Sequence, residues 1–304
     1  AFCKLVRRQV GYFRHDGQDK SGNADGKSYR MLSEGNVEGM SGMDNGKKQA
    51  WHRWCEAREK ELAGPDSWIG LIGLDWLESG VNRVGGAEDC VVRLPGGEAH
   101  LGDLVWLDDA LHWQPLNGDV QELVTDRDGA PTVVECAPFA FFVVERDGRL
   151  AARVRNREWA KTQPFAGLQY FDYDPAWAIE ADWLVLDPPV VMEVPNVTGD
   201  FKPVKVTHKA VFTVAGAQVE LLPMSVSEQE VFFVFRDRTS GRESYGAGRF
   251  LKAKPAKDGR IRLDFNFAFS PPCAFTAFAT CPLPPPENWL PFPITAGEKK
   301  WSGK

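Results

Sequence analysis

The chain has 304 residues, of which 43% are hydrophobic and 26% are charged, and it carries a formal net charge of −6 with a pI near 5.5. These values exclude a largely disordered or collagen-like chain. No apolar run is long enough to cross a bilayer, so a membrane protein is not expected. The acidic balance argues against a nucleic-acid partner, which would require a basic face.

Residues 1–42 differ in composition from the rest of the chain. They are rich in Gly, Ser, Asn and Asp and contain few large apolar side chains. Such a segment buries too little surface to offset its ordering entropy. We expect it to be either a flexible tail or a non-native extension upstream of a start at Met43 or Met40. It has no apolar stretch typical of a secretory signal, so we expect a cytoplasmic protein.

Residues 46–63 predict one short N-terminal helix. Asp44 or Asn45 is a suitable N-cap, and Gly64-Pro65 is a stop signal. The stripe that recurs at helical spacing consists of Trp51, Trp54, Cys55 and Leu62. Because a short helix with two Trp residues on one face is not stable alone, we expect this stripe to be buried against a sheet.

From Trp68 onward the hydrophobic pattern changes to a period of two, with frequent turn signals. Asp147-Gly148 is the strongest hairpin signal, because Gly accepts the positive φ of a tight turn. Ala215-Gly216 and Asp258-Gly259 separate further pairs of candidate strands. We therefore predict a mainly β fold, with antiparallel sheets arranged as a sandwich or barrel. No βαβ rhythm is present, which argues against a Rossmann or TIM fold.

The strand pattern is interrupted once, near residues 156–166. We expect residues 43–304 to form a single β-rich domain with two lobes, 67–155 and 165–304. No Pro- or Ser-rich linker separates these lobes, so we expect them to share a core.

Histidines and cysteines give no metal or cofactor signal. The five His residues show no ligand spacing, so no metal and no cofactor is expected. Cys273 and Cys281 are too far apart for a C-x-x-C motif. We expect them to be free thiols packed among Phe275 and Phe278, because nothing indicates an oxidising compartment. The histidines are His15, His52, His100, His112 and His208.

The densest polar segment runs through residues 235–299. On a strand, Asp264 and Asn266 would share one face, opposite neighbouring aromatic side chains. A buried carboxylate there needs a partner, which Arg249 or Tyr245 would supply. This cluster either lines a ligand pocket or forms a structural network that fixes the Gly-rich turn before it. The candidate ligand-binding residues are Arg236, Asp237, Tyr245, Arg249, Asp264, Asn266, Glu287 and Asn288.

A Pro-rich segment closes the chain. Its prolines forbid a helix or a central strand, so we expect an extended C-terminal strap. The interleaved apolar residues favour a strap that seals its own domain, and the alternative is a polyproline ligand for another protein. The prolines are Pro282, Pro284, Pro285, Pro286, Pro291 and Pro293.

Three stretches together resemble a known family. They are SWIGLIGLDWLESGVNRVGG, RDRTSGRESYGAGRFL and LDFNFAFSPPCAFTAFATCPLPPPENWLPFPITAGEKK. They are similar to a bacterial and archaeal family known as domain of unknown function 1684, over about residues 47–301. The resemblance implies Asn before the Pro-Pro-Cys run, where this sequence has Ser270. It implies no reaction, because the family has none assigned.

Three functions are compatible with these patterns. The first is a soluble β protein that binds a small polar molecule in a pocket of the C-terminal half. The second is a hydrolase or lyase that uses Asp264 as base, with Arg249 or Tyr245 stabilising negative charge. The third is a protein-interaction module that uses the Pro-rich strap. The sequence indicates neither the ligand nor the oligomeric state.

Overall fold

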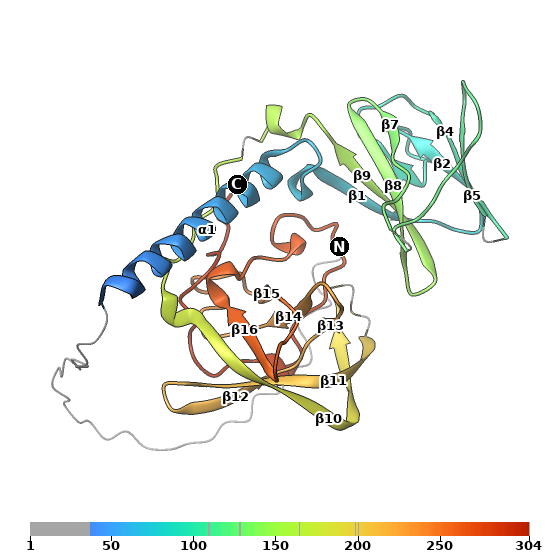
Figure 1. The fold of residues 1–304 in the computed structure, drawn as a ribbon. Helices are drawn as coiled ribbons and strands as arrows, with labels where there is room; N and C mark the ends of the chain where they lie inside the picture. Colours follow the sequence, from blue (N-terminus) through green and yellow to red (C-terminus); the bar gives the residue numbers. More distant parts are fainter. Residues whose placement is uncertain are drawn as a thin grey trace, which may run out of the picture. The chain divides into compact units, whose positions relative to one another are not determined.

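The computed structural model describes residues 37–303 apart from residues 109, 128, 164, 198 and 200, with side chains from Asn45 onward. Contacts divide the chain into residues 1–41 and 42–304, and the fold described below is that of the second part. The expectation for residues 1–42 falls mainly on residues 1–36, which lie outside the described residues. Figure 1 shows the ribbon.

Helix α1 spans Val37–Ala63, so it ends as predicted but begins before residue 46. Asp44 and Asn45 lie inside the helix, and the prediction that one of them caps it is wrong. Extending a helix costs little once its first turn has formed, so a capping residue does not by itself mark the start. The buried stripe agrees with the prediction: Trp51, Cys55 and Leu62 are buried, and Trp54 is half-buried.

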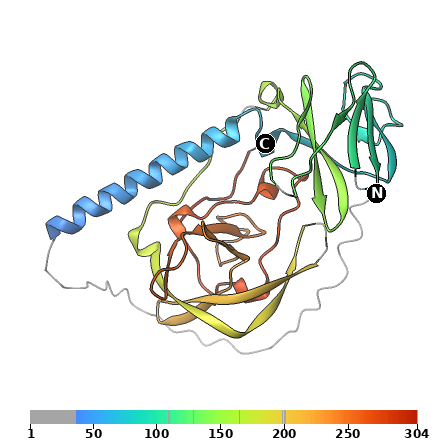
Figure 2. The same cartoon turned by 45° about the vertical axis from the view of Figure 1, so that its right-hand side comes forward.

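The described residues otherwise form sixteen strands in four sheets, almost entirely antiparallel, which confirms the mainly β prediction. The sheets curl strongly, as Figures 1 and 2 show. The strand orders are β1-β9-β8-β7, β3-β2-β4-β5-β6, β12-β11-β10-β16 and β13-β14-β15. The strands are β1 (Leu71–Trp76), β2 (Gly80–Gly85), β3 (Val92–Arg93), β4 (Gly102–Leu107), β5 (Ala110–Pro115), β6 (Gln121–Glu122), β7 (Val134–Cys136), β8 (Phe139–Arg146), β9 (Arg149–Asn156), β10 (Ala178–Pro195), β11 (Phe201–Val214), β12 (Ala217–Leu221), β13 (Ser225–Val226), β14 (Val231–Phe235), β15 (Arg249–Ala253) and β16 (Arg260–Asp264).

The two largest hydrophobic clusters involve different strands. One packs residues of β2, β4, β5, β8 and β9 around Phe141, and the other packs residues of β10, β11, β12, β14, β15 and β16 around Phe265. Trp113 meets Phe141 edge to face, and Phe235 meets Phe265 in the same way. The division into lobes that share a core stays a prediction.

Two of the three predicted hairpins are present. Asp147-Gly148 joins β8 to β9 and Ala215-Gly216 joins β11 to β12, with positive φ at both residues of each turn. Asp258-Gly259 also forms a tight turn, with φ of 50° and 70°. The strand that follows it, β16, pairs with β10 and not with β15. A tight turn reverses the chain locally, but the ladder partner is set by the available strand edge.

The C-terminal strap contains no strand and packs against its own chain, as predicted. Within it, the short 3₁₀ helix η7 spans Pro286–Asn288. The Leu290 amide donates to the Arg236 carbonyl (2.7 Å), and the Leu290 and Ile294 side chains are buried. Trp289 is an exception, with 54% of its surface exposed.

Candidate functional site

Arg249 and Asp237 form a fully buried ion pair at the centre of the predicted polar cluster. Arg249 Nη2 donates to Asp237 Oδ2 (2.5 Å) and to the Ile294 carbonyl (2.9 Å), and Nη1 donates to the Ala296 carbonyl. Asp237 Oδ1 accepts from the Thr239 amide (2.6 Å) and hydroxyl (2.5 Å). The prediction that Arg249 partners Asp264 is therefore wrong. Arg249 ties the strap to the Gly-rich turn.

Asp264 ends β16 and caps a 3₁₀ turn, η5 (Phe265–Phe267). Its Oδ1 accepts from the Asn266 amide (3.3 Å) and from Asn266 Nδ2 (2.9 Å). Asn266 is buried and exchanges two hydrogen bonds with the Asp174 backbone. The prediction that Asp264 and Asn266 alternate along a strand is wrong, because an Asp side chain that caps its own chain competes with a continued strand.

The other predicted residues lie in separate surroundings. Tyr245 Oη donates to the Cys273 carbonyl (2.9 Å), and no described hydrogen bond or ion pair joins Tyr245, Arg249 and Asp264 to one another. Asn288 is buried, and its amide bonds to the Leu222 and Val234 backbone. Glu287 is exposed.

Arg236 and Asp237 help to line a surface pocket of about 460 Å³ beside the strap. The Arg236 guanidinium lies 5.3 Å from the centre of the Trp289 ring. Of the eight predicted residues, these two are the ones that line a pocket described here.

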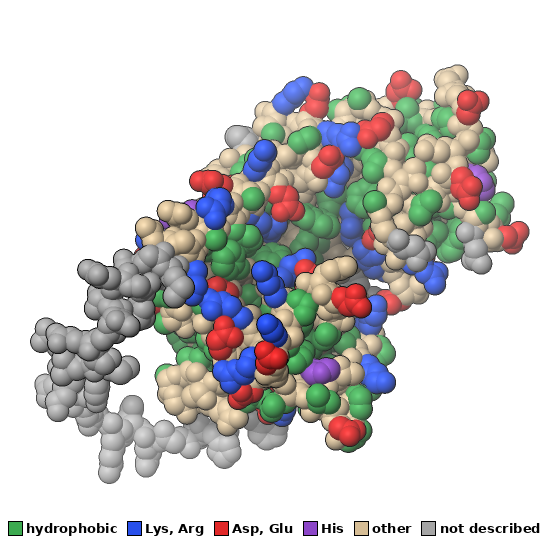
Figure 3. Space-filling view, in the orientation of Figure 1, with side chains coloured by type: hydrophobic (Ala, Val, Ile, Leu, Met, Phe, Trp, Pro, Cys, Tyr) green, Lys and Arg blue, Asp and Glu red, His purple; other side chains and the backbone are tan. Residues whose placement is uncertain are grey.

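A larger cleft lies beside the tip of the β8–β9 hairpin. Two hollows of about 520 and 280 Å³ share Arg146, Asp147, Asn196 and Thr280, so they are adjacent, and we name them together the Arg146 cleft. Figure 3 shows Lys and Arg side chains along a hollow in this face. The apolar side chains of the larger hollow are Val194, Pro195, Val204, Met224, Phe232 and Pro282. The charged side chains of the cleft are Asp126, Arg127, Glu145, Arg146, Asp147, Arg149 and Lys202.

Arg146 is held in place from both sides of the cleft. Its Nη1 and Nη2 donate to the two carboxylate oxygens of Asp126 (2.9 and 2.7 Å), and its Nε donates to Thr280 Oγ1 (3.1 Å). Burial alone would raise the pKa of Asp126, but the hydrogen bonds from Arg146 and from the Glu145 amide keep that pKa below its usual value. Asp126 is therefore ionised at neutral pH, and the pair is a fixed charged group.

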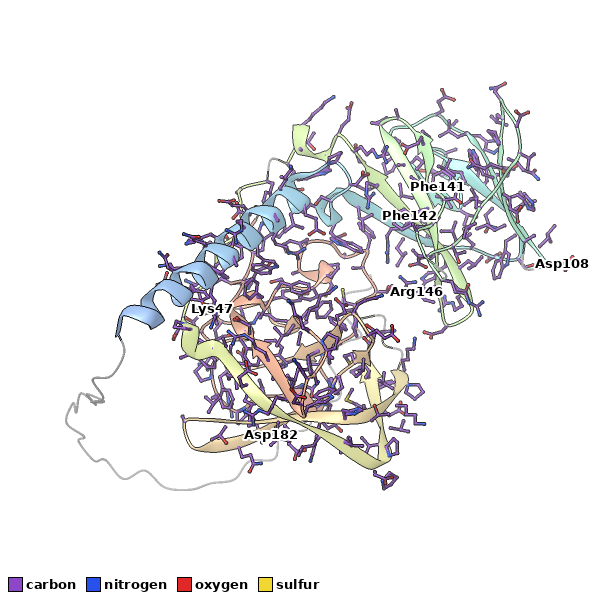
Figure 4. All side chains as sticks on the ribbon, in the orientation of Figure 1. Lys47, Asp108, Phe141, Phe142, Arg146 and Asp182 are labelled. Atoms are coloured by element: carbon purple, nitrogen blue, oxygen red, sulfur yellow. The ribbon has the colours of Figure 1, made fainter. Side chains whose placement is uncertain are left out.

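Four arginines share one face of the β8–β9 hairpin, which we call the arginine face: Arg146, Arg149, Arg153 and Arg155. Arg146 is the ladder partner of Arg149, and Phe142 that of Arg153. Phe142 and Arg146 are labelled along β8 in Figure 4. Because side chains alternate along a strand, the opposite face supplies the other residues, and these join the hydrophobic cluster. Those residues are Phe141, Val143, Leu150, Ala152 and Val154.

The four arginines differ in their partners. Arg155 pairs with Asp66 (3.0 Å), and the Arg149 guanidinium stacks 3.9 Å from the centre of the Trp76 ring. Within the described part of the chain, Arg149 forms no ion pair within 4 Å.

Arg153 is buried without a direct ion pair. It is 3% exposed and lies 5.4 and 5.9 Å from the centres of the Trp68 and Phe142 rings. Among the described residues it has no ion-pair partner, and its buried Nε has no hydrogen-bond acceptor. Burial, and then the nearby Arg146, lower the pKa of Arg153 to about 10, so the group is still charged at neutral pH. Arg153 thus carries a buried positive charge that no ion pair compensates among the described residues, although Asp126 stabilises it electrostatically from a greater distance.

The sequence analysis missed the arginine face, although a signal for it was present. In RLAARVRN, Arg149, Arg153 and Arg155 occupy alternate positions of one strand, in register with Arg146 across the predicted turn. From the sequence, this alternation of Arg and apolar residues predicted only the hairpin. Arginines on one face, opposite Leu and Val on the other, indicate a basic sheet surface as well.

Comparison with known proteins identifies the family of the C-terminal half. Residues 163–299 match the family described as protein of unknown function (DUF1684). The matched residues do not include the β8–β9 hairpin. No curated protein matches the chain.

One solved structure with similarity to the chain is the solution NMR structure of the uncharacterized protein from gene locus rrnAC0354 of Haloarcula marismortui. It has 35% sequence identity and a TM-score of 0.38, and the match covers 44% of this chain and 77% of that chain. In the part of the chain that the structure describes, no helix is apolar and long enough to span a membrane.

Proposed function

We propose that this protein binds a small organic anion in the Arg146 cleft. The ligand's carboxylate or phosphate group would lie toward the arginine face, and an apolar part would lie against the wall that contains Val194, Val204, Met224 and Phe232. The observation that carries the proposal is the lining of the cleft, where Arg146 and Arg149 lie opposite an apolar wall. Arg153, which is 3% exposed and has no ion pair among the described residues, does not line the cleft but interacts electrostatically with Arg146 and Asp126, which do.

The energetics of Arg153 support an anionic ligand. Moving a charged group from water into the protein interior without a partner costs roughly several kcal/mol. Proteins normally compensate this cost with an ion pair or with hydrogen bonds. Here the surrounding aromatic rings compensate only in part. A carboxylate or phosphate in the cleft would add negative charge near Arg153, and its oxygens would be acceptors for Arg149, a planar guanidinium that lines the cleft.

The cleft has a suitable size and lining. Its larger hollow of about 520 Å³ lies within the range of roughly 300–1,000 Å³ that is typical of small-molecule sites. An apolar wall that faces a few fixed charged groups favours an amphipathic organic anion over a bare inorganic ion. The C-terminal half supplies the apolar wall, and the β8–β9 hairpin supplies the arginines.

The alternative functions receive less support from the geometry. A catalytic group of Asp264 with Arg249 or Tyr245 would need side chains that no described contact brings together. A strap that docks a partner would need Pro285 and Trp289 exposed, and Pro285 is buried.

Thermal unfolding of the full chain in the presence of anions tests the proposal. The panel consists of inorganic phosphate, benzoate, an aliphatic carboxylate and a nucleoside monophosphate, each compared with sodium chloride at the same ionic strength. We expect at least one organic anion to raise the melting temperature in a saturable way. Occupancy at a hundred times the Kd stabilises the folded state by about 2.7 kcal/mol. An equal response to every anion and to sodium chloride would refute a specific site.

Two arginine variants locate the effect. Arg146→Gln should raise the Kd of the stabilising anion by roughly tenfold or more, because it removes a charge-assisted hydrogen-bond donor from the cleft. Arg238→Gln is the matched control, because Arg238 lines the separate pocket beside Trp289. Should Arg238→Gln lose as much affinity as Arg146→Gln, the ligand would not be in the Arg146 cleft.

A further inference from the structure

Two thiols that the proposed anion site does not use lie against each other. The Cys273 amide donates to Cys281 Sγ (3.3 Å), and each thiol shifts the pKa of the other. Both cysteines are free, Cys281 is buried, and Cys273 is partly exposed on the short 3₁₀ helix η6 (Pro272–Ala274). Cys273 is thus the more exposed residue of the two.

Tyr245 completes this cluster. Its hydroxyl donates to the Cys273 carbonyl (2.9 Å) and lies within hydrogen-bonding range of the Cys273 thiol. The hydrogen bond from Cys281 lowers the pKa of Cys273 against the opposing effect of burial, and Tyr245 lowers it further. The same contact, together with burial, raises the pKa of Cys281. Cys273 is therefore the thiol that ionises first, and Cys281 keeps its proton.

We propose that Cys273 and Cys281 form a redox-active dithiol that reduces small hydroperoxides. The accessible sulfur attacks and the buried sulfur resolves the product, which is the arrangement that reactive sensor cysteines require. This inference does not depend on the proposed anion site, because no residue of the thiol cluster lines the Arg146 cleft.

The chemistry balances in two steps. The Cys273 thiolate attacks one oxygen of a hydroperoxide: an S–O bond forms, the O–O bond breaks, and the leaving alkoxide takes a proton from water to become an alcohol. The Cys281 thiol then attacks the sulfenic sulfur: an S–S bond forms, the S–O bond breaks, and water leaves with the Cys281 proton. The dithiol loses two electrons, which the peroxide gains, and an external thiol restores the reduced pair.

Cys136 provides an internal control for the reactivity of Cys273. It is also partly exposed, but burial and then Glu135 raise its pKa to about 11. In the reduced full chain near neutral pH, iodoacetamide should modify Cys273 faster than Cys136 by at least roughly tenfold, as measured by peptide mass spectrometry. Equal rates would overturn the proposal. Because the comparison is made within one wild-type chain, it does not depend on the folding of any variant.

Oxidation with an equimolar hydroperoxide tests the second step. We expect loss of peroxide together with a Cys273–Cys281 disulfide that dithiothreitol reverses. In Cys281→Ser, peroxide should still react, but the product should be a sulfenic acid on Cys273 that dimedone traps. Cys136→Ser should behave like the wild type. Wild-type protein that shows no Cys273–Cys281 disulfide, or forms it no faster than other cysteine pairs, would refute the dithiol.

Discussion

Arg249 and Arg153 are both buried arginines, but their surroundings differ in one decisive respect. Arg249 meets Asp237 and several carbonyl groups that need a donor, so its charge and most of its hydrogen bonds are satisfied. Arg153 meets aromatic rings and another arginine, and no carboxylate pairs with it among the described residues. The fold supplies a direct ion pair to the first arginine and only the more distant Asp126 to the second, which is why we propose an anionic ligand nearby.

The Arg249–Asp237 pair predicts a large loss of stability when one partner is removed. Asp237→Asn leaves a buried guanidinium without its counter-charge, which typically costs about 3–5 kcal/mol. Asp182→Asn is the matched control, because the Asp182–Arg260 pair is exposed and such pairs contribute about 0–1 kcal/mol. Urea unfolding measures both. Similar losses in the two variants would show that Asp237 is not the buried anchor described here.

The partner of Arg249 could not be predicted from the sequence. Asp237 and Asp264 are both acidic and near Arg249 in the chain, and nothing in their local patterns separates them. Which aspartate pairs with Arg249 depends on where β14, β15 and the strap meet. The presence of a polar network around Arg249 was predictable, but its pairing was not.

At the scale of single elements, helix α1 illustrates what local patterns can predict. The Trp51–Leu62 stripe follows from helical spacing, and the structure buries it. Trp51 Nε1 donates to the Asn266 carbonyl (3.0 Å), a contact over a sequence separation of more than two hundred residues. No local pattern contains that information.

Leu62→Ala tests the packing of α1. Leu62 is fully buried in a small cluster with Ile69, Trp159 and Phe275. Truncating it should lower the free energy of unfolding by about 2–5 kcal/mol. Lys60→Ala, on the exposed side of the same helix, should change it by less than about 0.5 kcal/mol. If urea unfolding gave the same small change for both, the helix would not be part of the core.

The β strands show the same division between local and distant information. Alternation and turn residues located the hairpins at Asp147-Gly148 and Ala215-Gly216, because each depends on neighbours in sequence. The pairing of β16 with β10 was not predicted, since the partner strand lies far away in the chain. The 3₁₀ turn after Asp264 was not predicted for a related reason. The local sequence is compatible both with a strand that continues and with a turn that Asp264 caps.

At the scale of the molecule, the net charge of the chain and the local charge of the arginine face have opposite signs. The whole chain carries −6, which argues against a nucleic-acid partner. The arginine face concentrates four positive charges on one hairpin, of which Arg146 and Arg155 have carboxylate partners among the described residues. Since charges interact mainly within about 10 Å at moderate ionic strength, the local arrangement decides what binds there.

Arg153→Met is the most direct test of the claim that Arg153 is held for an anion. Replacing a buried ion pair by apolar side chains is often neutral or stabilising by about 1–4 kcal/mol, and removing a buried charge that forms no ion pair leaves no partner unsatisfied. We therefore expect Arg153→Met without ligand to melt at or above the wild-type temperature, and to lose the rise produced by the anion that stabilises the wild type. Arg249→Met, which leaves Asp237 unpaired, should melt well below the wild type and controls for arginine removal as such. A variant Arg153→Met that is strongly destabilised and still gains the full stabilisation from that anion would contradict the account.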